Sequence, residues 1–72
     1  MGATSLVKVR DVIRLLEREG WRLVRTRGSH RQYKHPFREG LVTVPGNPGA
    51  ELATGTLNSI LKQAGLRRGR TP

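Results

Sequence analysis

Apolar residues recur at helical spacing in two segments of the chain, residues 8–19 and residues 54–64. In each segment they fall at i, i+3, i+4 and i+7, which places them on one face of an α-helix. The stripes consist of Val9, Val12, Ile13 and Leu16 in the first segment and of Leu57, Ile60, Leu61 and Ala64 in the second. Gly20 and Gly65 follow directly, and glycine commonly follows a helix C-terminus. The sequence therefore predicts two amphipathic helices.

Three short segments between these helices have the character of β-strands: residues 21–25, 30–34 and 41–44. Arg27-Gly28 is predicted to make the first turn, and residues 37–40 the loop after the second strand. Pro36 and Pro45 end the second and third strands, because proline cannot donate a hydrogen bond to a neighbouring strand. The pattern predicts a three-stranded meander between the helices.

Alternation along the strands predicts which side chains share a face. In the first strand the two sets are Trp21, Leu23 and Arg25 against Arg22 and Val24. In the second they are His30, Gln32 and Lys34 against Arg31, Tyr33 and His35. We expect Trp21 and Tyr33 to turn toward the helices. The alternation alone leaves open which face is wet, since a one-residue slip would exchange the two sets.

These elements give an α+β fold, a two-layer α-β-β-β-α arrangement with a three-stranded antiparallel sheet and both helices on one face. The expected core consists of Val12, Ile13, Leu16, Trp21, Leu57, Ile60 and Leu61. Residues 8–66 would form one domain, between a flexible N-terminus at residues 1–7 and a flexible basic tail at residues 67–72. The same order of elements is found in double-stranded-RNA-binding domains.

The charge of the chain points to a polyanionic partner. With 14 basic and 5 acidic residues the formal net charge is +9, and eleven of the basic residues are arginine. A membrane surface is disfavoured because the three aromatic residues do not lie on one face of a basic helix. There is no cysteine, no apolar run of membrane-spanning length and no signal-peptide pattern, so we expect a cytoplasmic protein without disulfides.

The candidate chemistry lies in one segment. Residues 20–38 contain six cations and no acid, and both histidines of the chain lie among them. His30 is the candidate acid or base, since histidine exchanges protons near neutral pH. The candidate RNA or phosphate contacts are Arg27, Ser29, Arg31, Gln32 and Lys34. His35 is a candidate second acid or base, although its place before Pro36 favours a loop residue. Two histidines without cysteine do not predict a metal site, and no cofactor is expected.

Several motifs in this order resemble the HicA (YcfA-like) family of toxins. They are Glu19-Gly20-Trp21, Arg27-Gly28-Ser29-His30, Tyr33-Lys34-His35-Pro36, Val42-Thr43-Val44-Pro45, Gly55-Thr56-Leu57 and Ser59-Ile60-Leu61-Lys62-Gln63-Ala64-Gly65, spread over residues 8–66. The resemblance implies a fold like that of double-stranded-RNA-binding domains, metal-independent cleavage of mRNA and neutralisation by a HicB antitoxin. It places His30 at the position of the family's catalytic histidine.

The chain departs from the family pattern after the third strand. The family often has a second histidine in a Pro-x-His arrangement, where this chain has Pro45-Gly46-Asn47, and Ala53 and Thr54 replace cations that often precede Gly-Thr-Leu. Three classes of function remain: an endoribonuclease toxin, a non-catalytic RNA-binding module that uses the same basic face, and an interaction protein that binds an acidic partner.

Overall fold

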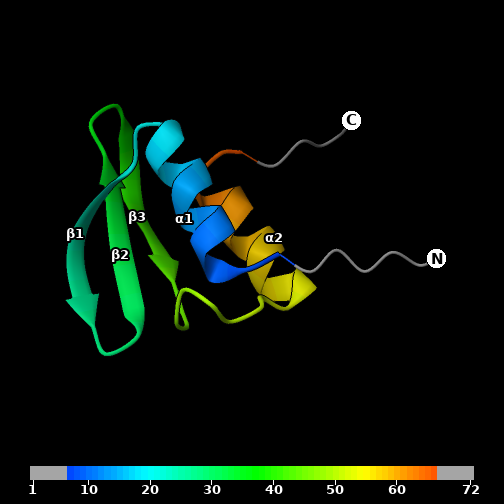
Figure 1. The fold of residues 1–72 in the computed structure, drawn as a ribbon. Helices are drawn as coiled ribbons and strands as arrows, with labels where there is room; N and C mark the ends of the chain where they lie inside the picture. Colours follow the sequence, from blue (N-terminus) through cyan, green and yellow to red (C-terminus); the bar gives the residue numbers. More distant parts are fainter. Residues whose placement is uncertain (1–6, 67–72) are drawn as a thin grey trace, which may run out of the picture.

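The computed structural model describes residues 7–66 of the chain, and the expectations for residues 1–6 and 67–72 lie outside this range. The elements follow in the order α1 (Val9–Arg18), β1 (Arg22–Arg27), β2 (His30–His35), β3 (Arg38–Val44) and α2 (Thr54–Gln63). The strands form one antiparallel sheet in the order β1-β2-β3. Both helices cover the same face of this sheet (Figure 1). The predicted two-layer α-β-β-β-α fold is confirmed.

The core lies between the helices and the covered face of the sheet. It is formed by Val9, Val12, Leu16, Trp21, Tyr33, Val42, Val44, Ile60 and Ala64. Trp21 and Tyr33 are each only 1% exposed, which confirms that both turn toward the helices. Of the other residues expected in the core, Ile13 and Leu57 pack against it half-buried. The expected place of Leu61 in the core is wrong, because Leu61 is half-buried and is not among the residues packed against the core. The helical stripes thus face the sheet as their spacing predicts.

The loop between β3 and α2 is fixed to the beginning of α1. The N–H groups of Val9 and Arg10, in the first turn of α1, donate to the carbonyls of Ala50 and Pro48 at 2.9 and 3.0 Å. The Leu52 N–H donates to the carbonyl of Val7 at 2.9 Å. The bonds from Val9 and Arg10 satisfy N–H groups of the first turn of α1 that have no partner within the helix. Val7 is therefore part of the folded domain, one residue before the predicted boundary.

The boundaries of the strands differ from the expectation, and so does the grouping of side chains on the two faces of β1. The predicted loop at residues 37–40 is wrong, because β3 already begins at Arg38 and only Pro36 and Phe37 separate it from β2. Trp21 precedes β1, and the first turn is Gly28-Ser29. The register of β1 shifts between Leu23 and Arg25, so that Leu23 lies opposite Tyr33 and Arg25 opposite Gln32. Such a bulge adds a residue and interrupts the alternation of side chains.

Candidate functional site

The face of the sheet that the helices leave open carries His30. Tyr33 points into the core, so the alternating residues of β2 that point the other way are His30, Gln32 and Lys34. His30 is exposed and lies directly after the Gly28-Ser29 turn. Gly28 has a φ of +57°, a left-handed conformation that glycine adopts without strain and that closes this tight turn. The turn thus sets His30 at one end of the open face.

Each of these three residues of β2 has an arginine of β1 directly opposite. The pairs are Arg27 with His30, Arg25 with Gln32 and Arg22 with Lys34. Residues opposite each other in an antiparallel pair point to the same face. Arg22 and Arg25 are three residues apart and would point to opposite faces in a regular strand. The bulge at Val24 places both on the open face, which corrects the predicted grouping of Arg25 with Trp21.

Two other cations of the acid-free segment belong to the opposite face. Arg31 is half-buried, and its Nη1 donates to the carbonyl of Gly46 at 3.1 Å, which ties β2 to the loop that follows β3. Arg38 lies opposite His35, and its guanidinium contacts Gly65 just after α2. The sequence placed Arg31 among the contacts near His30. The structure instead gives it a bond that holds the loop.

His35 is also held on the covered side. A carbonyl can only accept, so the Nε2–H of His35 donates to the Glu19 carbonyl at 3.0 Å, and the Phe37 N–H donates to Nδ1 at 3.0 Å. Both ring nitrogens are therefore occupied by backbone groups. His35 lies five residues from His30 along β2 and faces the other way, so the structure does not bring the two histidines together.

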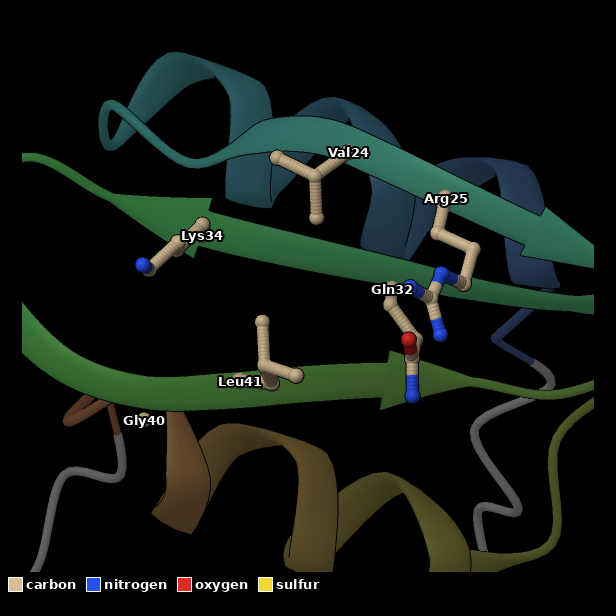
Figure 2. Close-up of a pocket in the computed structure, with 6 residues that line it drawn as sticks. All are labelled: Val24, Arg25, Gln32, Lys34, Gly40 and Leu41. Atoms are coloured by element: carbon tan, nitrogen blue, oxygen red, sulfur yellow. The ribbon is translucent and has the colours of Figure 1, made fainter.

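A groove of about 470 Å³ lies on the open face of the sheet, and Gln32, two residues after His30 in β2, is part of its lining. It is lined by Val24, Arg25, Gln32, Lys34, Gly40 and Leu41, which come from all three strands (Figure 2). Gln32 and Lys34 were expected as contact residues, whereas Val24, Gly40 and Leu41 were not. Leu41 alternates with the buried Val42 and Val44, so regular alternation in β3 places it on this face. Val24 and Gly40 lie where the pairing registers of β1 and β3 shift, so no periodic signal identifies them.

Two other predicted positions lie at the same end of the sheet as His30. Ser29 is half-buried in the β1–β2 turn, and Asn47 is exposed in the loop after β3. Figure 1 shows this turn and this loop at the same end of the molecule. Asn47 accepts a hydrogen bond from the Ala50 N–H through its backbone carbonyl, at 2.9 Å. The position where the family often has a second histidine is therefore near the end of the sheet that carries His30.

The core residue Tyr33, which lies in the same strand as His30, has a shifted pKa. Burial raises the pKa of Tyr33 above its ordinary value, the carboxylate of Glu17 raises it further, and Arg31 opposes the shift. Among residues 7–66, no group of three or more His, Cys, Asp or Glu side chains is placed to hold a metal ion. Within the same range, no helix is long and apolar enough to cross a membrane.

The comparison with known protein families gives the same assignment as the motifs. The profile described as "HicA toxin of bacterial toxin-antitoxin" matches residues 9–66, which include every helix and strand of the structure. No curated protein sequence matches the chain. Because the match covers most of the chain, this protein belongs to the HicA toxin family of bacterial toxin–antitoxin systems.

Proposed function

We propose that this toxin is an endoribonuclease of the mRNA interferase type, with His30 as its catalytic acid or base. The observation that carries the proposal is the pairing of an exposed His30 with Arg27 on the open face of the sheet. The HicA family is known for mRNA interferases, and this family membership supports the same reaction class.

RNA supplies its own nucleophile, so the protein has little chemistry to perform. His30 would take the proton of a 2′-hydroxyl group as that oxygen attacks the adjacent phosphorus, or would give a proton to the leaving 5′-oxygen. The guanidinium of Arg27 would stabilise the negative charge of the phosphorane. The open face is in contact with solvent, so water can carry the other proton. The products are a 2′,3′-cyclic phosphate and a free 5′-hydroxyl, and no metal is needed.

A non-catalytic RNA-binding module is the second candidate. It is favoured by the absence of a second free histidine: His35 is held by Glu19 and Phe37, and Asn47 occupies the position of the family's second histidine. In that case His30 would be one polar contact on a basic surface.

Cleavage of a long single-stranded RNA in EDTA separates the two candidates. A general acid or base contributes roughly 10² to 10⁴ in rate, so His30→Ala should slow cleavage at least 100-fold while RNA binding changes little. His30→Gln keeps a polar side chain that cannot carry the proton, and it should be equally slow. A substrate with a 2′-deoxy sugar at the cut site should bind and stay intact. Cleavage by His30→Ala at the wild-type rate would disprove the assignment, and binding without any cleavage by the wild type would favour the module.

A toxin of this family has an antitoxin partner. We infer that the partner is a HicB-like protein that acts by covering the face around His30. The cations of β1 and β2 on that face favour an acidic contact surface on the antitoxin. If so, antitoxin and RNA should compete for the toxin, which a displacement titration with labelled RNA would measure.

A further inference from the structure

The groove on the open face is lined in part by apolar side chains that are open to solvent. Val24 of β1 and Leu41 of β3 line the groove on either side of the central strand, and they remain 54% and 46% exposed. Figure 2 shows them on the outer strands, with Gln32 and Lys34 between them. Isolated apolar side chains at a surface are common, but here two of them line one concave site together with polar groups. Sites for small ligands commonly combine apolar side chains with a few polar groups that fix the orientation of the ligand.

The charges around the groove favour an anionic ligand. Arg25 and Lys34 are both part of the lining, and none of the six lining residues is acidic. Arg22 and Arg27 extend the positive charge along β1 in both directions on the same face. A ligand that combines an apolar plane with negative charge fits this surface, and a nucleotide has both.

The groove fits an unpaired base better than a duplex. A volume of about 470 Å³ lies within the range of small-ligand sites. Arg25 lies beside Gln32 and offers a planar guanidinium, a group on which proteins stack RNA bases that have left the helix. The Gln32 amide has donors and an acceptor for the edge of such a base. A duplex keeps its bases stacked, so its phosphates would contact the cations around the groove while its bases stayed outside.

The position of Gln32 connects the groove to the cleavage site. Gln32 follows His30 on the same face of β2, two residues or about 6.7 Å along the strand. A phosphate at His30 would therefore have an adjoining nucleoside within reach of the groove. We propose that the groove binds one base of single-stranded RNA next to the scissile phosphate, with Gln32 as the residue that selects the base. This inference rests on the proposed ribonuclease function for the position of the cut, but base binding can be measured without cleavage.

The test uses short single-stranded RNAs in which each position in turn carries each of the four bases. Their affinities are measured for His30→Ala protein, which leaves the RNA intact. A hydrogen-bonded base contact should produce a preference of about fivefold or more at one position. Adding Gln32→Met, which keeps the side-chain length but removes the amide, should abolish this preference. Gln63→Met at the exposed end of α2 is the matched control and should preserve it. Gln32→Glu, which stays polar and loses the amide donors, repeats the test if the Met variant unfolds.

The outcomes separate the subsite from the catalytic proposal. Loss of base preference in the Gln32 variants supports the subsite even if the wild type cuts no RNA, in which case only the ribonuclease assignment fails. An unchanged preference in folded Gln32 variants overturns the subsite, whether or not the protein is a ribonuclease. Binding of duplex RNA as tightly as single strands, or no binding of any RNA, also overturns it. If the wild type cuts RNA, the base selected in the binding series should also flank its cut sites.

Discussion

The imidazole of His35 lies edge-on against the indole of Trp21, with the ring centroids 5.2 Å apart and an interplanar angle of 64°. Trp21 is the buried residue between α1 and β1, and His35 ends β2. The bond from His35 Nε2 to the Glu19 carbonyl reinforces this contact at the C-terminal end of α1. The pair therefore fastens the first helix to the central strand of the sheet.

This arrangement predicts that His35→Ala destabilises the fold and leaves the chemistry intact. The variant loses two hydrogen bonds and the contact with the buried Trp21, each worth roughly 0.5 to 1.5 kcal/mol, so the free energy of unfolding should fall by about 2 to 4 kcal/mol. The contact with the exposed Phe37 adds little. Urea denaturation measures this loss. The cleavage rate per folded molecule should be unchanged. A fully stable His35→Ala protein that no longer cleaves RNA would instead make His35 the second acid or base.

Two glycines provide a matched test of the same contact. Gly20 and Gly28 have φ values of +98° and +57°, so alanine is strained at both. A Cβ on Gly20 would lie 2.7 Å from Nε2 of His35, whereas a Cβ on Gly28 would meet nothing within 4 Å. Gly28→Ala should therefore cost about 1 to 2 kcal/mol of stability, and Gly20→Ala clearly more.

A double-mutant cycle shows whether the larger loss of stability expected for Gly20→Ala comes from the contact with His35. In a His35→Ala background the added Cβ at Gly20 no longer meets the imidazole, so Gly20→Ala should cost less there than in the wild type. Purely additive losses would show that the backbone conformation alone disfavours alanine at Gly20.

The sheet face, not the helix layer, should carry the RNA. Arg25, Arg27 and Lys34 lie on the open face, and replacing all three by alanine should reduce the slope of log affinity against log salt by about 2, at roughly 0.7 per phosphate on single strands. The exposed cations of α1 are the matched control: Arg10, Arg14 and Arg18, which carry the same total charge. Filter binding over a range of salt concentrations measures both slopes. A larger effect of the helix variant would place RNA on the helices.

Tyr33 should make the fold sensitive to alkali. Because burial raises its pKa in the folded protein, the folded state holds the phenol proton more tightly than the unfolded state. The corresponding stability is fully present below the ordinary pKa of about 10 and is lost as the pH rises through the higher folded value. Thermal unfolding of the wild type and of Tyr33→Phe on both sides of pH 10 measures this loss of stability. All other titratable groups are present in both proteins, so the difference between the two pH dependences comes from the Tyr33 phenol. Parallel losses of stability in the two proteins would contradict it.

The sequence by itself determined the order of the elements and part of the core, whereas the burial of Val42 and Val44 was not predicted. Two stripes of helical spacing, a glycine after each helix and three short strands predicted the α-β-β-β-α order, because hydrophobic periodicity identifies the type of element. The expected burial of Trp21 and Tyr33 is also confirmed, although alternation alone left open which strand face is buried. Alternation in β2 also correctly grouped His30 with Gln32 and Lys34, since this strand is regular from His30 to Tyr33. The sequence motifs also predicted the family, which the match over residues 9–66 confirms.

The tertiary structure decided which cations accompany His30. Arg25 joins the open face through a bulge, and a bulge depends on the pairing with β2 and not on the residues of β1 alone. Arg31 and His35 instead lie on the covered side of the sheet, where they bond to Gly46 and Glu19, 15 and 16 residues away. A local pattern cannot report such partners, because the fold brings distant backbone carbonyls next to these side chains. The open face with its groove therefore exists only in the folded sheet.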